Sequence, residues 1–136
     1  MTNEAIDLIK KHEGFRQFPY KCTAGKMTIG YGRNIEDVGI SKEEALFLLV
    51  GDVARCEQDL QSIFLQFDHF TRNRRVALID MRYNLGPSRF RGFKRMLAAI
   101  LADDWDRAAD EAMDSEWYRQ VKSRGPVIAG MLRGDI

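Results

Sequence analysis

One segment limits the possible folds of this chain more than any other, a long amphipathic stretch between Ser41 and Phe64. It opens with Ser41 and Glu44, the spacing of a capping box, in which each side chain bonds the backbone N–H of the other residue. Apolar residues then recur every three or four positions, at Ala45, Leu49, Val53, Cys56, Leu60 and Ile63. This period is typical of one helix face, so we expect a helix over about 42–64. Gly51 lies within it and costs up to about 1 kcal/mol, but the apolar row continues past it.

The segment before this helix has a different texture. A short helix, capped by Thr2 or Asn3, is expected to run through His12. Glycine, aromatic and β-branched residues then alternate, and they predict two short strands, Phe15–Tyr20 and Met27–Gly32, joined by a tight turn.

Beyond the long helix the patterns are helical to the end of the chain, with no convincing strand. We therefore predict an α+β fold that is predominantly α, formed by one domain over residues 1–136. Its parts are a small hairpin lobe over about 13–41, a linking helix over about 42–64 and a helical lobe over about 65–136.

Composition excludes several classes of protein. The 136 residues carry 21 basic and 20 acidic side chains, a net charge of +1 that gives no global case for nucleic-acid binding. Two cysteines make no disulfide framework, and two isolated histidines make no metal cluster. The longest apolar runs fall far short of the roughly 18–20 residues of a membrane span, and the first residues lack the features of a signal peptide. We expect a cytoplasmic protein with reduced thiols.

Charge is nevertheless segregated in the second half of the chain. Residues 72–95 contain eight basic side chains against Asp80 alone, and residues 103–116 contain seven acidic side chains against Arg107 alone. Two solvated faces that partly pair with each other are one interpretation, and a surface for an anionic polymer is the other.

The residues that indicate chemistry lie around the predicted hairpin. Glu13, Cys22 and Thr28 follow the spacing E-x8-C-x5-T, with Glu13 at the end of the first helix and the other two flanking the hairpin turn. Thr28 is expected on a polar strand side that faces a substrate. Gly30 and Gly32 leave that side of the strand bare, so that a sugar ring can approach the backbone.

This motif resembles the active-site signature of phage lysozymes (endolysins) of the T-even type, glycoside hydrolase family 24. Those enzymes carry Glu, then Asp or Cys, then Thr at the same spacing, before a T-I-G-x-G strand. The resemblance covers nearly the whole chain and includes RRVALIDMRYNLG at residues 74–86 and the Trp117-Tyr118 pair.

The resemblance implies a lysozyme-like fold, with the N-terminal helix packed on the helical lobe, and a muramidase activity. The bond cleaved would be the β-1,4 bond between N-acetylmuramic acid and N-acetylglucosamine of peptidoglycan. Glu13 would be the general acid, which partial burial would keep protonated, and Arg124 would support it. Cys22 and Thr28 would position or activate water. Tyr83 aligns with an aromatic residue of the family's sugar cleft, although a core position is as well supported.

Cys22 departs from the T-even pattern, which has aspartate there. A thiol is mostly neutral at pH 7 unless its surroundings favour the thiolate, and Lys21 or Lys26 is a candidate for that effect. A small residue packed in a hairpin is the alternative reading of Cys22. Cys56 lies on the apolar row of the long helix and is expected to be an inert, packed thiol.

The resemblance implies no cofactor, a monomer, and a holin-type membrane protein that releases the enzyme. The enzyme would stay in the host bacterial cytoplasm until lysis and act on the cell wall. Three alternatives stay open: a lytic transglycosylase that uses Glu13 alone, a non-catalytic wall-binding or assembly protein on a lysozyme scaffold, and a nucleic-acid module that uses residues 72–95.

Overall fold

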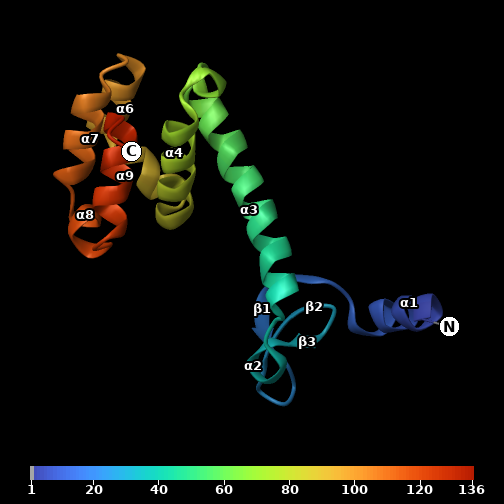
Figure 1. Ribbon diagram of the computed structural model, residues 1–136. Coiled ribbons are helices and arrows are strands. Elements are labelled where there is room, and N and C mark those ends of the chain that lie inside the picture. Colours follow the sequence, from blue (N-terminus) through green and yellow to red (C-terminus); the bar gives the residue numbers. More distant parts are fainter. Residues whose placement is uncertain (1) are drawn as a thin grey trace. The chain divides into compact units, whose positions relative to one another are not determined.

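The computed structural model describes residues 2–136 and divides into two compact units, Met1–Leu48 and Leu49–Ile136. We call them the N-terminal unit and the C-terminal unit. The architecture is predominantly helical with one small antiparallel sheet (Figure 1), which confirms the predicted fold class. The predicted lobe boundaries, and the packing of the N-terminal helix on the helical lobe, stay predictions.

The N-terminal unit contains a helix, a three-stranded sheet and a short second helix. In chain order these are α1 (Thr2–Glu13), β1 (Arg16–Lys21), β2 (Met27–Gly30), β3 (Arg33–Asn34) and α2 (Ile35–Val38). The strand order is β1-β2-β3, all antiparallel, and Thr28 in the central strand lies opposite Tyr20 on one side and Asn34 on the other. The predicted hairpin is thus confirmed.

The second strand is shorter than predicted, and two small elements were not predicted. Strand β2 ends at Gly30 because Gly30 and Gly32 adopt φ of 69° and 75°, which turns the chain back on itself. The elements β3 and α2 have two and four residues, too few for any apolar periodicity to show in the sequence.

The long helix α3 (Lys42–Ile63) confirms the central prediction. Its capping box is formed as expected: the N–H of Glu44 donates to Ser41 Oγ at 3.1 Å, and the N–H of Ser41 donates to Glu44 Oε1 at 2.8 Å. Gly51 does not interrupt it. The boundary between the two units falls inside this helix, between Leu48 and Leu49.

The C-terminal unit is entirely helical after α3. Its elements are the 3-10 helix η1 (Phe67–His69), α4 (Arg72–Leu85), α5 (Pro87–Arg91), α6 (Lys94–Leu101), α7 (Trp105–Met113), α8 (Glu116–Gln120) and α9 (Arg124–Arg133). Side chains cap several of them: Thr71 accepts from the N–H of Arg74, and Asp104 accepts from the N–H of Arg107. The short elements η1 and α5 were not predicted.

Within this unit, α9 packs against α4 and α7, and α6 packs against α7 (Figure 1). The apolar sides of these helices, together with the end of α3, η1 and α5, form one core. Its largest fully buried side chains are Phe64, Phe67, Phe90, Leu60, Leu78, Met81, Met96 and Leu132. Trp105 and Trp117 are buried, and the indole N–H of Trp117 donates to Asn84 Oδ1 at 2.8 Å. No helix among residues 2–136 combines the length and apolarity that crossing a bilayer requires.

One ion-pair cluster ties three helices of the C-terminal unit together. Asp59 of α3 accepts from Arg82 of α4 at 2.7 Å and from Arg91 of α5 at 2.5 and 2.9 Å. The Asp59 side chain is only 19% exposed. Hydrogen bonds from Arg91 above all, and from Arg82, lower the pKa of the Asp59 carboxyl to about 2 from its ordinary 3.8.

We expect Asp59→Asn to lower the free energy of unfolding of the C-terminal unit by about 2 kcal/mol at pH 7. Because the folded pKa lies below the unfolded value, this contribution is present above about pH 5 and is lost as the pH falls towards 2. Urea unfolding at pH 7 and pH 3, followed by tryptophan fluorescence, checks this, since both tryptophans of the chain lie in this unit.

Asp52→Asn is the matched control, because the Asp52–Arg55 pair joins residues three apart on the exposed surface of α3 and is worth little. A destabilisation by Asp59→Asn that is the same at both pH values would contradict the assignment.

Candidate functional site

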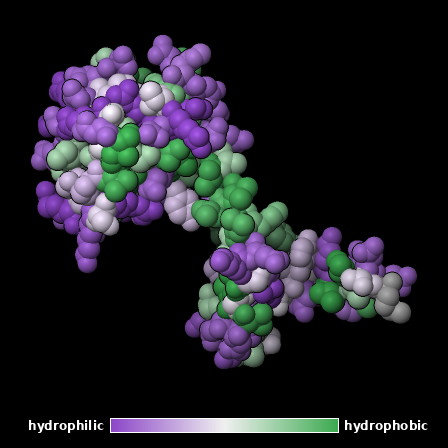
Figure 2. Space-filling view, in the orientation of Figure 1, coloured by the Kyte–Doolittle hydropathy of each residue, from purple (hydrophilic) through white to green (hydrophobic). Residues whose placement is uncertain are grey.

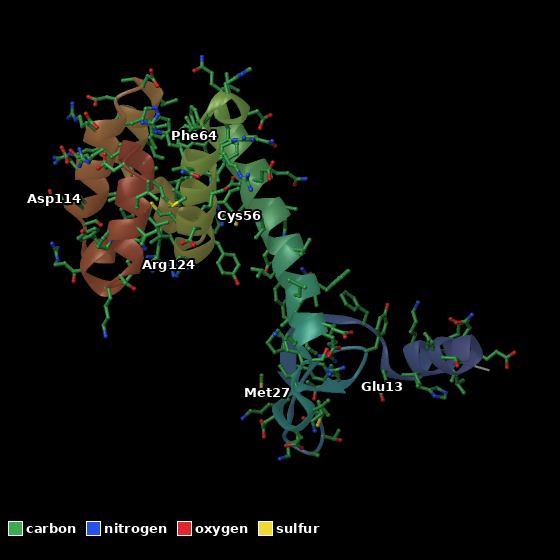
Figure 3. The ribbon with its side chains drawn as sticks, in the orientation of Figure 1. Glu13, Met27, Cys56, Phe64, Asp114 and Arg124 are labelled. Carbon is green, nitrogen blue, oxygen red and sulfur yellow. The ribbon has the colours of Figure 1, made fainter. Side chains whose placement is uncertain are left out.

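Glu13 is the last residue of α1 (Figure 3), and its side chain lies against Gly32. A Cβ at Gly32 would be 2.5 Å from Glu13 Oε2 and 2.6 Å from its Cδ, so any other residue there would displace the carboxylate from this position. Gly32 also has φ of 75°, which disfavours any side chain. The structure thus brings together two of the predicted site residues, Glu13, which precedes the sheet, and Gly32, which lies between β2 and β3. Glu13 is exposed, so its own unit does not supply the burial expected of a general acid.

Cys22 lies at the first position of the hairpin turn, and backbone hydrogen bonds of this residue close the turn. The N–H of Cys22 donates to the carbonyl of Lys26 at 2.9 Å, and the N–H of Gly25 donates to the carbonyl of Cys22 at 2.8 Å. Hydrogen bonds from the backbone of Lys26, then from that of Ala24, hold the pKa of the partly exposed Cys22 thiol below its ordinary value. The turn therefore makes the Cys22 thiol more acidic than a free cysteine.

The cause of this lowering differs from the one suggested by the sequence. The ammonium of Lys26 lies 3.3 Å from Asp37 Oδ1 and 3.5 Å from Glu36 Oε2, both acidic residues of α2. Backbone amides of the turn, rather than the charge of Lys21 or Lys26, favour the ionised sulfur. The sequence could not reveal that Lys26 pairs with these acidic residues, because the helix α2 that carries them is too short to be recognised.

Thr28 is buried, with 3% of its surface exposed, whereas an open strand side was expected there. The central position of β2 explains this, since Thr28 is covered by neighbouring strands on both sides. Its hydroxyl donates to the carbonyl of Lys26 at 2.9 Å, the same carbonyl that accepts from the N–H of Cys22. Cys22 and Thr28 thus share one acceptor. Gly30 does have open space: no atom lies within 4 Å of where its Cβ would be.

Two predicted residues lie in the C-terminal unit. The Nε of Arg124, at the start of α9, donates to Asp80 Oδ1 at 2.8 Å, a partner that the sequence did not single out. The only hint was that Asp80 is the sole acid among residues 72–95. Tyr83 is 45% exposed rather than a core residue, and it lines a pocket of about 240 Å³ together with Asp52, Arg55, Cys56 and Arg82.

Cys56 behaves as expected of a packed thiol. It is buried, and burial raises the pKa of its thiol, with a smaller opposing effect of the Arg82 charge. The two cysteines of the chain are therefore chemically different: Cys22 is partly exposed and its pKa is lowered, whereas Cys56 is enclosed and its pKa is raised.

The two charged segments do not pair with each other. Among residues 2–136, no ion pair joins residues 72–95 to residues 103–116; the acids of the second segment pair with Arg119 and Arg133 instead. The visible face of the C-terminal unit is mostly hydrophilic (Figure 2). Opposite charges line one pocket of about 470 Å³, with Arg89, Lys94 and Arg95 contributing cations and Glu111, Asp114 and Glu116 contributing carboxylates.

No group of three histidine, cysteine, aspartate or glutamate side chains within residues 2–136 is arranged to hold a metal ion. What the structure brings together instead is a helix-terminal carboxylate against a glycine turn, and a thiol beside a buried hydroxyl. A carboxyl group of this kind can deliver a proton, and a thiolate beside a hydroxyl oxygen can orient water.

Comparison with known proteins gives a consistent picture. Residues 10–134 match the phage lysozyme family. The chain is 30% identical over 146 aligned positions to the pre-baseplate central spike protein Gp5 of Enterobacteria phage T4, which covers 87% of this chain but 25% of that protein. It is 28% identical to an endolysin of Acyrthosiphon pisum secondary endosymbiont phage 1, covering 98% of this chain and 90% of that protein. A probable T4-type lysozyme 2 of Dictyostelium discoideum is 26% identical, with coverages of 91% and 90%.

Proposed function

Because this chain belongs to the phage lysozyme family, we propose that it is a muramidase that hydrolyses the β-1,4 bond between N-acetylmuramic acid and N-acetylglucosamine in bacterial peptidoglycan. The observation that carries the proposal is the paired geometry of the N-terminal unit. Glu13 lies against Gly32, and Cys22 and Thr28 meet at the carbonyl of Lys26. These are the residues of the motif that resembles the family's active-site signature.

In the proposed reaction Glu13 donates its proton to the leaving glycosidic oxygen as the bond from that oxygen to the anomeric carbon breaks. Glu13 is exposed in its own unit, so the bound glycan itself supplies the desolvation that keeps the acid protonated. The open space at Gly30 allows a pyranose ring to approach the strand closely.

The attacking water is oriented by Cys22 and Thr28. The single hydroxyl proton of Thr28 is donated to Lys26, so Thr28 Oγ1 acts towards a water as an acceptor. A water that donates one proton to the Cys22 thiolate and the other to Thr28 keeps a lone pair free for the anomeric carbon. As the new C–O bond forms, the water proton passes to the thiolate.

Residues of the C-terminal unit support this reaction in the proposal. Tyr83 offers a half-exposed ring for stacking on a sugar. Arg124 keeps the supporting role that the family resemblance implies, with its Nε engaged by Asp80.

Digestion of purified peptidoglycan, followed by mass spectrometry of the soluble fragments, tests the proposal. Hydrolysis leaves reducing N-acetylmuramic acid ends. Fragments with anhydro ends would establish a lytic transglycosylase instead, and the absence of any fragments would exclude a catalytic function. Proton NMR of the first-formed anomer then determines whether the configuration is inverted or retained.

A second candidate function has one observation in its favour: one relative is a phage spike protein, of which this chain matches a quarter. A non-catalytic role in phage assembly or wall binding would follow from that likeness. This non-catalytic role would be favoured if a variant without the Glu13 carboxyl group kept full biological activity.

We expect Cys22 to be needed as the thiolate. Turnover should therefore fall as the pH is lowered and Cys22 takes up a proton. Cys22→Asp should keep or raise activity, and its turnover should fall only at a lower pH, because aspartate ionises near pH 4. Cys22→Ser should lower turnover about a hundredfold, since a serine hydroxyl does not ionise in this range. The pH dependence of turnover for the three proteins checks this.

Alkylation gives an independent check. Iodoacetamide should modify Cys22 well before the buried Cys56, whose thiol is also less acidic, and should stop turnover while the fold persists. Full activity after complete modification of Cys22 would exclude a chemical role for the thiol.

As a phage muramidase of this kind, the enzyme is proposed to act as a monomer without a cofactor. It would collect in the cytoplasm of the host bacterium and reach the wall when a holin-type membrane protein opens the membrane.

A further inference from the structure

Arg33 of β3 bonds two other parts of the N-terminal unit, the side chain of Glu44 and the backbone of Gly39. Its guanidinium grips the Glu44 carboxylate with both amino groups, Nη2 to Oε1 and Nη1 to Oε2, each at 3.1 Å. Its Nε donates to the carbonyl of Gly39 at 3.0 Å. A forked pair of this kind fixes orientation as well as distance, which a lysine ammonium cannot do.

The other end of this connection is rigid. Glu44 lies in the first turn of α3 and also accepts from the N–H of Ser41 at 2.8 Å, so the carboxylate is held by the capping box. Arg33 lies in β3, which has two residues and pairs with β2 only through Asn34 and Arg33 themselves. So short a strand has little ladder of its own to hold it. The Arg33–Glu44 pair therefore fixes β3 to the start of a 22-residue helix.

Both halves of the proposed active site depend on where β3 lies. Gly32, against which the Glu13 carboxylate lies, directly precedes Arg33. Asn34, which follows Arg33, is the strand partner of Thr28. The turn from Gly30, the last residue of β2, to β3 contains two glycines at positive φ, Gly30 and Gly32, and the side chain of Tyr31 between them packs against Phe15, with ring centroids 5.5 Å apart.

We propose that Arg33 is a positioning residue of the enzyme: through Glu44 and Gly39 it holds the glycine turn against which Glu13 is placed, and it keeps Thr28 in register. It contacts no reacting atom. The inference rests on the proposed function, and it adds a residue pair outside the E-x8-C-x5-T motif to the machinery of the site.

The test compares Arg33→Gln, Arg33→Lys, Glu44→Gln and the double variant Arg33→Gln/Glu44→Gln with the wild type on soluble peptidoglycan fragments. We expect Arg33→Gln to lower kcat about tenfold with a much smaller change in KM, because placement of the acid is disturbed rather than sugar binding. Arg33→Lys should recover part of the loss. The double variant should be no worse than the poorer single variant, because the two residues act as one unit.

Arg119→Gln is the matched control, since Arg119 forms an exposed ion pair with Glu116, three residues away, in the C-terminal unit. It should keep the kcat and KM of the wild type. Thermal unfolding of every variant shows how much of each is folded at the assay temperature. A loss of kcat no larger than the loss of folded protein, or additive effects of the two single variants, would overturn the proposal.

Amide hydrogen exchange supplies a readout that does not depend on activity. In Arg33→Gln the amides of Gly32 and Asn34 should exchange faster, while those of α4 and α9 stay as in the wild type. Unchanged exchange at Gly32 would overturn the proposal even if activity fell. If wild type and Arg119→Gln both release no sugar, the proposed function fails, and the exchange result still decides whether Arg33 holds the turn.

Discussion

Glu13→Gln should lower turnover on peptidoglycan about a thousandfold while the chain keeps its fold. Glutamine has nearly the same shape as glutamic acid but has no acidic proton to donate to the leaving glycosidic oxygen, and loss of a general acid costs roughly 10²–10⁴ in rate. Glu13 is exposed and forms no ion pair with any other residue within 2–136, so the substitution removes little from the folded state. The release of reducing ends, measured against time, gives the rate for each protein.

Glu4→Gln is the matched control, because Glu4 is an exposed glutamate in the first turn of the same helix, α1. It should keep the wild-type rate. If Glu13→Gln also keeps that rate, Glu13 is not the acid, and a non-catalytic function on this scaffold becomes the better reading.

Gly32→Ala is expected to lower turnover about a hundredfold by displacing the Glu13 carboxylate. The new methyl group would lie 2.5 Å from Glu13 Oε2, well inside contact distance, so the acid must move. Misplacing a catalytic group by about an ångström costs on the order of 10²-fold in rate. The loss should therefore appear in kcat and exceed the loss of stability, which circular dichroism melting measures.

Gly86→Ala separates this displacement from backbone strain. Gly86 also has a positive φ, 84°, but nothing lies within 4 Å of its Cβ position, and it ends α4 far along the chain. Alanine there should cost about 1–3 kcal/mol of stability, because φ 84° and ψ 170° is a conformation almost restricted to glycine, and it should leave turnover unchanged. Equal losses of activity in the two variants would show that strain alone, and not contact with Glu13, explains the result.

The two residue pairs of the proposed active site, Glu13 with Gly32 and Cys22 with Thr28, differ in how much of them the sequence could predict. The E-x8-C-x5-T spacing singled out Glu13, Cys22 and Thr28 as candidates without any structure. The contact between Glu13 and Gly32 could not be predicted, because it depends on how the end of α1 meets a turn 19 positions further along the chain. The acidity of Cys22 was attributed to lysine charges, and it comes from backbone amides whose direction depends on the turn conformation.

The charged segments provide a similar contrast. Their composition was plain in the sequence, but their partners were not. Three of the eight basic residues in 72–95 are used within the fold: Arg82 and Arg91 bind Asp59, and Arg74 donates to the carbonyls of Leu132 and Arg133 at the end of α9. Pairing across helices depends on crossing geometry, which no count of charges contains.

By itself the sequence determined the long helix, its capping box, the hairpin and the motif, because each of these depends on residues close together along the chain. Helix periodicity, caps and turns act over a few positions, so local interactions are enough to specify them. Only the tertiary structure decided that Thr28 is buried, that Glu13 lies on Gly32 and that Arg33 ties a two-residue strand to α3. Those facts depend on contacts between distant segments, whose free energy is gained only when the chain has closed the loops between them.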